Sequence, residues 1–210
     1  IPGSDDAIRT LTTFSNAEGE VRCMSGGVVC LQDHDPTAIG NPLCILGERE
    51  NAIVECAKRF VKRVGYCGMA NFDIKLDERD GSFRFFEVNT RCGRNTYYMS
   101  LGGQNFVELI VREFVMGQPV EYHEAYNPFL YCCVPAYVLK RSMDNQERLT
   151  QALKALKATD EPTRCITRRF LQAQYVGEDH APEPDSQVQA VLLGHERKAA
   201  EVEALPILFP

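Results

Sequence analysis

The sequence has no long apolar run, no excess of positive charge and no C-x-x-C motif. No stretch approaches the ~18 consecutive apolar residues of a membrane-spanning helix, so we expect no membrane span, and we expect no secretory signal peptide. The formal net charge of −6 gives no support for nucleic-acid binding, which relies on clustered Lys and Arg. What remains is an ordinary globular composition, with 44% hydrophobic residues and a length of 210 residues that can bury a sizeable core.

The nine cysteines lack the spacing of a structural framework. No two of them form a C-x-x-C pair, and none has a histidine at the spacing of a zinc site. An odd number of cysteines in a chain without a secretion signal predicts buried free thiols in a reducing cytoplasm. The four histidines show neither a ligand cluster nor a triad pattern. The predicted location is therefore cytoplasmic, and neither zinc nor disulfides are expected.

Residues 71–91 predict a β-hairpin. Polar and apolar residues alternate over 71–77 and again over 86–89, as they do in half-buried strands. A three-residue loop over 79–81 would put Gly81 where the turn needs a left-handed backbone, which glycine adopts without strain. That loop fixes the register of the two strands.

The register brings polar side chains together on one face of the hairpin. Asp73 faces Glu87 and Asn71 faces Asn89, with facing Cβ atoms ~5 Å apart. The residues expected on the core side are Phe72, Ile74, Leu76, Phe86 and Val88, and those left on the polar side include Phe83 and Phe85. The two phenylalanines on the polar face are unexplained by this register.

The polar face suits a hard divalent cation. Two carboxylates this close repel each other when both are ionised, and a bound cation removes that cost. Asp73, Glu87 and Asn89 offer only oxygen ligands, which favours Mg²⁺ or Mn²⁺ over zinc. Mg²⁺ commonly takes few protein ligands and completes its shell with water and substrate phosphates. From these residues alone, a solvated face of an edge hairpin is the alternative.

The second strand ends in E-V-N-T-R, residues 87–91. A carboxylate strand followed by a strand that ends in E-x-N-x-R resembles the ATP-grasp superfamily. The resemblance implies that Asp73, Glu87 and Asn89 bind ATP through the Mg²⁺ (or Mn²⁺) ions that bridge its phosphates. It also implies that Arg91 contacts phosphate or an acyl-phosphate intermediate.

Two further arginines are candidates for catalytic contacts. In this family a strand near the start of the matching region carries a basic residue that points at the phosphates, and Arg9 is the candidate here; a surface strand arginine is the alternative. Arg94 could hold the substrate carboxylate or its acyl phosphate, or it could pair with a surface carboxylate. Tyr97 and Tyr98 are interpreted as packing residues.

The activity implied by the resemblance is ATP-dependent ligation. A small-molecule carboxylate is activated as an acyl phosphate, and an amine substrate then displaces phosphate to form an amide. Within the superfamily the chain looks most like carboxylate–amine ligases of the D-aspartate ligase kind, which act in the bacterial cell wall; the phrases at 37–41 and 87–94 carry this. Thr90 also occurs at this position in biotin-dependent carboxylases. A carboxylase-type enzyme therefore stays open, as does a non-catalytic structural or interaction module.

The resemblance covers residues 1–141 and corresponds to the C-terminal half of an ATP-grasp unit. The chain begins Ile-Pro-Gly without Met, so we expect a fragment that is inactive alone and whose missing N-terminal half is its partner. A homodimer is left open. Residues 142–210 are expected to form a C-terminal extension of unknown role.

The fold class implied is α+β, an antiparallel sheet with helices packed on one face, plus the smaller C-terminal extension. Strands are expected over 6–15, 20–32 and 129–139, the last at an edge because it contains Pro135, and a loop over 33–47. Helices are expected over 49–64 with Gly65 after it, over 105–116 as a well-buried helix, and over 144–158 with Asp144 as N-cap.

Overall fold

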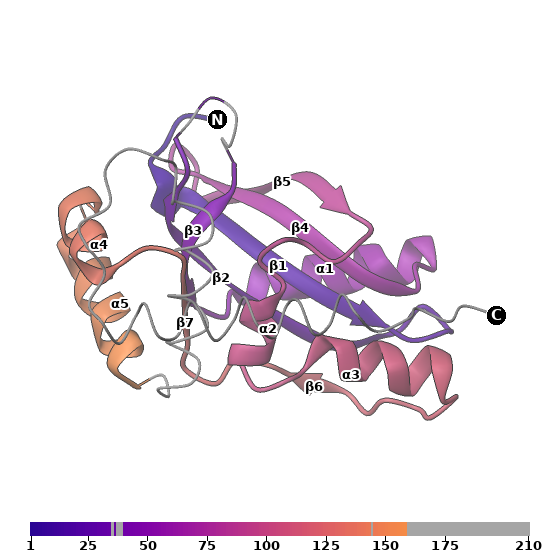
Figure 1. Ribbon diagram of the computed structural model, residues 1–210. Coiled ribbons are helices and arrows are strands. Elements are labelled where there is room, and N and C mark those ends of the chain that lie inside the picture. Colours follow the sequence, from indigo (N-terminus) through magenta and orange to yellow (C-terminus); the bar gives the residue numbers. More distant parts are fainter. Residues whose placement is uncertain (35, 37–39, 144, 159–210) are drawn as a thin grey trace, which may run out of the picture. The chain divides into compact units, whose positions relative to one another are not determined.

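A computed structural model describes residues 1–34, 36, 40–143 and 145–158, which are built around one sheet (Figure 1). Across the sheet the strands are β5 (Ser82–Asn89), β4 (Gly68–Asp77), β1 (Ile8–Ser15), β2 (Val21–Gln32), β3 (Pro42–Gly47) and β7 (Leu130–Cys132). Each neighbouring pair is antiparallel, and a short strand, β6 (His123–Glu124), pairs in parallel with β2. The strands predicted over 6–15 and 20–32 are confirmed, with a 3₁₀ turn, Asp5–Ala7, before β1.

Strand β3 lies inside the segment 33–47, which the sequence predicted to be a loop. The apolar run 43–46 makes an inner strand, because β2 and β7 pair with its two sides. Four apolar residues are too few for periodicity to distinguish a buried strand from part of a loop. The loop prediction is therefore wrong for Pro42–Gly47.

The helices are α1 (Asn51–Val64), α2 (Tyr97–Leu101), α3 (Phe106–Ile110), α4 (Ala136–Ser142) and α5 (Gln146–Ala158). Helix α1 confirms the helix predicted over 49–64, because Ile53, Ala57 and Val61 are buried along one side. Gly65 follows it in the left-handed conformation, with φ 62°, and its N–H bonds to the last turn of the helix. A glycine tolerates that backbone at no steric cost.

Helices cover both faces of the sheet, whereas one covered face was expected. On one face Leu11 and Phe72 pack with α1. On the other, Phe14 and Met69 pack with residues of α2 and α3. Strand β1 is buried at nearly every position, because other elements pack against both of its faces. The α+β class and the largely antiparallel sheet are confirmed.

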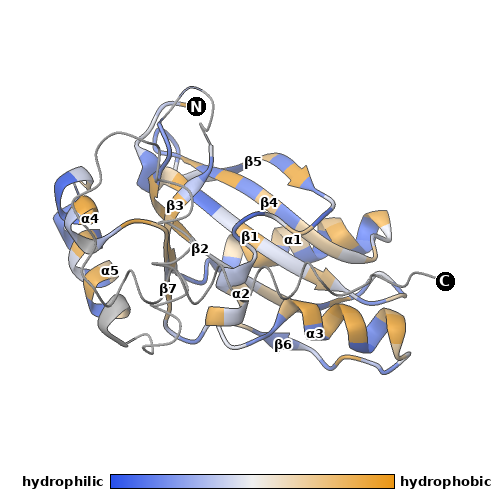
Figure 2. Ribbon diagram, viewed as in Figure 1, coloured by the Kyte–Doolittle hydropathy of each residue, from blue (hydrophilic) through white to orange (hydrophobic). Residues whose placement is uncertain are grey.

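The helix predicted over 105–116 is neither uniform nor well buried. Asn105 caps α3 by accepting hydrogen bonds from two backbone N–H groups. The helix ends at Ile110 and continues as a π-helical turn, Val111–Val115. Figure 2 shows apolar residues along much of α3, but Val115 is 76% exposed and Met116 57% exposed. Only one side of α3 packs on the sheet. The apolar residues on its other side stay exposed, because no other described element packs against them.

The segment 129–139 is a strand only at its start. Strand β7 is an edge strand, as Pro135 predicted, but Pro135 itself occupies the N-cap position of α4. The next helix, α5, has Asn145 at its start, whose side chain accepts a bond from the Arg148 backbone at 3.0 Å. Asp144, the predicted cap, lies outside the described residues.

Helix α5 places Leu149 in the same buried cluster as residues of β3 and β7. The described part of the predicted extension thus packs on the sheet, and a boundary after residue 141 stays a prediction. No helix in the described part of the chain combines the length and the apolar character that crossing a membrane requires.

Candidate functional site

The hairpin of β4 and β5 places the predicted carboxylates opposite each other. Asp73 pairs with Glu87 and Asn71 pairs with Asn89, as the sequence predicted. Strand β5 is the outermost strand at this end of the sheet (Figure 1), so the site lies at an edge. Asp73 is half-buried on the inner strand, while Glu87 is exposed on the outer one.

The turn of the hairpin differs from the predicted one. Asp77 pairs with Ser82, so the loop contains the four residues 78–81 rather than three. Gly81 has φ 70°, the left-handed backbone expected of it. A loop longer by one residue shifts every later pair by one and reverses which face each side chain of β5 occupies.

A β-bulge reverses that shift before the site is reached. Ile74 pairs with Phe85, while the preceding residue, Asp73, pairs with Glu87. Phe86 is therefore the extra residue of the bulge, and two residues of β5 oppose one of β4. The predicted pairing of Asp73 with Glu87 is correct because the longer loop and the bulge compensate for each other.

The bulge also accounts for the phenylalanines that the predicted register left on the polar face. Phe83 and Phe85 pack on the α1 side, and the ring of Phe85 lies edge-on to Phe72 at 5.9 Å between centroids. Phe86 is 60% exposed and Val88 is 37% exposed. The prediction that Phe86 faces the core is therefore wrong, whereas Val88 pairs with Phe72 and lies on the predicted side, partly exposed at the sheet edge.

Amide groups hold the Asp73 carboxylate in place. Asn71 Nδ2 donates to Oδ1 of Asp73 at 3.3 Å, and Asn89 Nδ2 donates to its Oδ2 at 3.4 Å. Arg91, just beyond the end of β5, donates from Nη2 to Oδ1 of Asn89 at 3.3 Å. Asp73, Asn89 and Arg91 therefore form one connected group, and Glu87 faces Asp73 within it.

A chain of buried hydroxyl groups lies behind this group, and sequence reasoning missed it. Thr12 Oγ1 donates to Oδ1 of Asn71 at 2.9 Å and lies 2.6 Å from the Tyr98 hydroxyl. Thr10 donates to the same Asn71 oxygen at 3.4 Å. Tyr98 is fully buried, so it is a packing residue that also fixes the polar chain. Threonines at alternate positions of β1 were the available signal.

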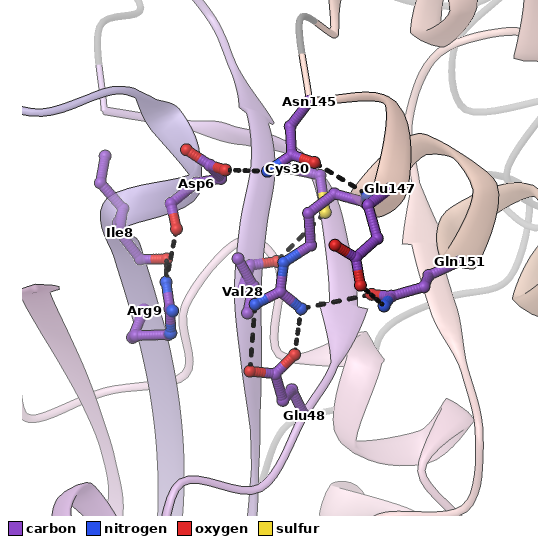
Figure 3. Close-up of polar contacts among 10 residues, drawn as sticks. Asp6, Ile8, Arg9, Val28, Cys30, Glu48, Asn145, Glu147 and Gln151 are labelled. Atoms are coloured by element: carbon purple, nitrogen blue, oxygen red, sulfur yellow. Dashed lines mark hydrogen bonds and ion pairs between the residues drawn. The ribbon is translucent and has the colours of Figure 1, made fainter.

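Arg9 does not join the carboxylates. Thr10 is the residue of β1 that pairs with Asp73, so its neighbour Arg9 points to the other face. There its guanidinium lies 5.9 Å from the ring centroid of Phe83, and Nη1 donates to the backbone oxygens of Asp6 and Ile8 (Figure 3). The predicted phosphate contact for Arg9 is therefore not supported by its position.

Arg94 lies three residues beyond Arg91, in the loop that follows β5, and its side chain is exposed. Within the described part of the chain its guanidinium takes part in no ion pair. The alternative interpretation, a pairing with a surface carboxylate, is therefore not seen in that part of the chain.

The donor set fits a hard divalent cation with few protein ligands. Two carboxylates and the Asn89 amide oxygen are available, and the described residues hold no cluster of three or more His, Cys, Asp or Glu side chains that could hold a metal. Mg²⁺ accepts such a set because water and phosphate oxygens complete its octahedron. A cation here would also offset the repulsion between Asp73 and Glu87.

The titration of Asp73 gives a first test of this geometry. Its pKa is raised from 3.8 to about 6, because burial disfavours the ionised form and the Glu87 carboxylate lies opposite. Between these pH values the folded protein binds more protons than the unfolded chain, so this group makes the free energy of unfolding fall as the pH rises. We expect Asp73→Asn to remove that contribution, measured as the difference between the two proteins in urea denaturation across the range. Identical pH profiles would contradict the raised pKa.

Comparison with known proteins finds a family match that includes the hairpin. Residues 41–102 match the family model of the carbamoyl-phosphate synthase L chain, ATP binding domain. The chain is 35% identical over 119 residues to a D-aspartate ligase from Enterococcus faecium (strain Aus0004), which is 57% of this chain and 28% of that protein.

Two solved structures give partial matches. The biotin carboxylase domain of Hydrogenobacter thermophilus 2-oxoglutarate carboxylase, in complex with MgADP, ADP and bicarbonate, has a TM-score of 0.45 and 17% identity over 60% of this chain and 29% of that one. An L-amino acid ligase from Bacillus licheniformis has a TM-score of 0.37 and 20% identity over 52% of this chain and 29% of that one.

The chain spans less than a third of the length of the D-aspartate ligase that it matches. The stretch matched by the family model contains the whole hairpin and its E-x-N-x-R motif, so the match falls on the candidate site itself. The resemblance inferred from the hairpin is confirmed by both comparisons, because the chain is similar to this ATP-binding domain and to a D-aspartate ligase.

Proposed function

We propose that this chain is part of an ATP-dependent carboxylate–amine ligase that forms an amide bond through an acyl phosphate. The observation that carries the proposal is the opposed pair Asp73 and Glu87, with Asn89 and Arg91 following on the same side of the hairpin. Phosphoryl transfer needs mainly positioning and charge stabilisation from a protein, which such a cluster supplies. The match to a D-aspartate ligase supports an amino acid as one substrate.

The cofactors of the proposed enzyme are ATP and Mg²⁺, or Mn²⁺ in its place. Asp73, Glu87 and Asn89 would hold the metal, which when bound supplies positive charge to the phosphate oxygens. Arg91, which donates a hydrogen bond to Asn89, would contact phosphate or the acyl phosphate. Arg94, exposed in the next loop, would orient the substrate carboxylate.

The proposed chemistry has two steps. A substrate carboxylate oxygen attacks the γ-phosphorus of ATP, the bond from that phosphorus to the ADP oxygen breaks, and an acyl phosphate forms. An amine then attacks the acyl carbon and phosphate leaves with the bonding electron pair, giving an amide after the nitrogen loses a proton. Arg91 and Arg94 would bind the negatively charged oxygens of the acyl phosphate.

The partners proposed for the chain follow from its partial coverage of the relative. An upstream half of the same enzyme would supply the rest of the nucleotide site, and the small-molecule acid and amine substrates would bind between the halves. A homodimer and a role in the bacterial cell wall are further parts of this proposal. The eight cysteines in the described part of the chain are free, which supports a cytoplasmic location.

Phosphate release tests the proposal. The enzyme with both halves of the ATP-grasp unit is incubated with Mg-ATP and a panel of D- and L-amino acids, with bicarbonate as a separate arm. We expect one amino acid to stimulate phosphate release and an amide product to appear by mass spectrometry when an amine acceptor is added. Release stimulated only by bicarbonate would favour the carboxylase-type alternative.

A metal titration separates a missing substrate from a missing activity. The same protein is titrated with Mg²⁺ and Mn²⁺ in a calorimeter, with Asp73→Asn as the control that should bind more weakly. Binding without phosphate release would leave the ligase class intact and call for other acceptors. Absence of both binding and release would favour a non-catalytic structural or interaction module.

A further inference from the structure

Three cysteines that lie far apart in the sequence meet beneath α4 and α5. Cys30 of β2, Cys44 of β3 and Cys132 of β7 belong to one buried cluster and are 5%, 0% and 4% exposed. The thiols of Cys132 and Cys30, together with burial, hold the pKa of the Cys44 thiol well above its usual range. The prediction of buried cysteines is confirmed for these residues, but their proximity could not be inferred, because three separate strands supply them.

Cys44 and Cys132 have the strand geometry of a cross-strand disulfide. They are directly opposed in the antiparallel pair of β3 and β7. Cys133 N donates to Leu43 O at 2.7 Å, so that neighbouring pair is hydrogen-bonded and Cys44 with Cys132 is the alternate, non-hydrogen-bonded kind. Cα atoms in such pairs lie ~4.5 Å apart, which falls inside the ~4.4–6.8 Å range of disulfides.

Cys30 connects this pair to solvent. A cavity of about 570 Å³ is lined by Cys30 together with polar residues that include Asp6, His34 and Asn145. Asn145, which lines the same cavity as Cys30, donates from its amide to Asp6 at 2.8 Å (Figure 3). A small oxidant in this cavity would meet Cys30 before it met the two cysteines behind it.

Cys30 also lies beside Cys44, and of these two thiols Cys30 is the more acidic. Val29 pairs with Ile45 and Leu31 pairs with Cys44, so Cys30 is the extra residue of a bulge opposite Cys44. The pKa of the Cys30 thiol lies below its usual range, chiefly because of its hydrogen bond with Cys44. A lower pKa raises the fraction of thiolate, which is the form that reacts with peroxide.

We infer that Cys44 and Cys132 form a disulfide when the protein meets hydrogen peroxide, and that Cys30 reacts first. Peroxide oxidises the Cys30 thiol to a sulfenic acid and is reduced to water. The Cys44 sulfur attacks the Cys30 sulfur, so an S–S bond forms as the S–O bond breaks and a second water leaves. Cys132 then attacks Cys44 and releases Cys30 as a thiol. In sum, one peroxide and two thiols give one disulfide and two waters.

The experiment uses the full chain with the other reactive thiols removed. Cys67 and Cys92 are exposed, so they are replaced by serine together with Cys165, which lies outside the described residues. After treatment of the folded protein with peroxide, non-reducing peptide mapping is expected to show the Cys44 peptide linked to the Cys132 peptide. The mass of the linked peptides should equal the sum of the two reduced peptides minus the mass of two hydrogen atoms.

Variants separate the roles of the three thiols. Cys30→Ser is expected to slow formation of the linked peptide at least ~10-fold without abolishing it. Cys132→Val keeps an apolar side chain in the cluster and should abolish the link. Cys23→Ala, a buried cysteine of another cluster, should leave the rate unchanged. Circular dichroism confirms that each variant is folded.

Three results would overturn the inference. The thiols could react only after the protein is unfolded, a Cys30–Cys44 bond could be the stable product, or Cys30→Ser could oxidise at the rate of its parent. The first result would show that peroxide does not reach the thiols through the cavity of the folded protein. The second would show that the disulfide does not form between β3 and β7. The third would show that Cys30 is not the first thiol to react.

Discussion

Glu87→Gln, in the enzyme with both halves of the ATP-grasp unit, is expected to lower the rate of Mg-ATP-dependent phosphate release at least ~100-fold. The substitution keeps the size and polarity of the side chain but removes the negative charge that faces Asp73. A cation held between the two strands would lose one of its two carboxylate ligands. Initial rates of phosphate release at saturating ATP measure the effect.

The same substitution is expected to leave the fold almost unchanged. Glu87 is exposed on the edge strand β5, so its replacement should alter the free energy of unfolding by less than ~0.5 kcal/mol. Urea denaturation of the variant provides this second readout. A large loss of turnover with little loss of stability is what a metal-binding role predicts and a purely structural role does not.

Glu78→Gln is the matched control for this prediction. Glu78 is an exposed carboxylate in the turn of the same hairpin, away from the pair formed by Asp73 and Glu87. Its replacement removes the same charge from the same element, so it should leave turnover within ~2-fold of the parent. Near-normal turnover in Glu87→Gln, or equal losses in both variants, would contradict the site assignment.

The site could be predicted because its central residues lie in one hairpin. Asp73, Glu87, Asn89 and Arg91 fall within 19 residues of sequence, and the period-two alternation of a strand fixes which of them share a face. Arg9 shows the limit of the same reasoning, since it belongs to another strand. A displacement of one residue along β1 exchanges the two faces of the sheet, and Thr10 rather than Arg9 occupies the face of Asp73.

Features that depend on distant contacts could not be predicted from local patterns. The hydrogen bond between Thr12 and Tyr98 joins residues 86 positions apart, and Cys44 meets Cys132 only because β7 pairs with β3. The exposure of Val115 has the same origin. An apolar pattern indicates that one side of a helix favours burial, but it does not show whether another element packs against that side. The loop of four residues and its compensating bulge accompany the packing of Phe83 and Phe85 on the α1 side.

Phe72→Ala is expected to lower the free energy of unfolding by about 3–5 kcal/mol. Phe72 is 1% exposed and packs edge-on against Phe60 and Phe85, with 5.9 Å between ring centroids in each case. Truncation would leave a cavity between α1 and the strand that carries Asp73. Urea denaturation of the full chain measures the loss, and a change below ~1 kcal/mol would contradict the packing of β4 on α1.

Phe85→Ala and Phe86→Ala form a matched pair that tests the bulge itself. The two residues are adjacent and chemically identical, but Phe85 packs on Phe72 while Phe86 is 60% exposed. We expect Phe85→Ala to cost about 2 kcal/mol and Phe86→Ala to stay within about 0.5 kcal/mol of the parent in the same assay. In the register predicted without a bulge, Phe86 faces the core and Phe85 does not. The opposite order of stabilities would therefore remove the bulge and show that Asp73 and Glu87 are brought together by the three-residue loop instead.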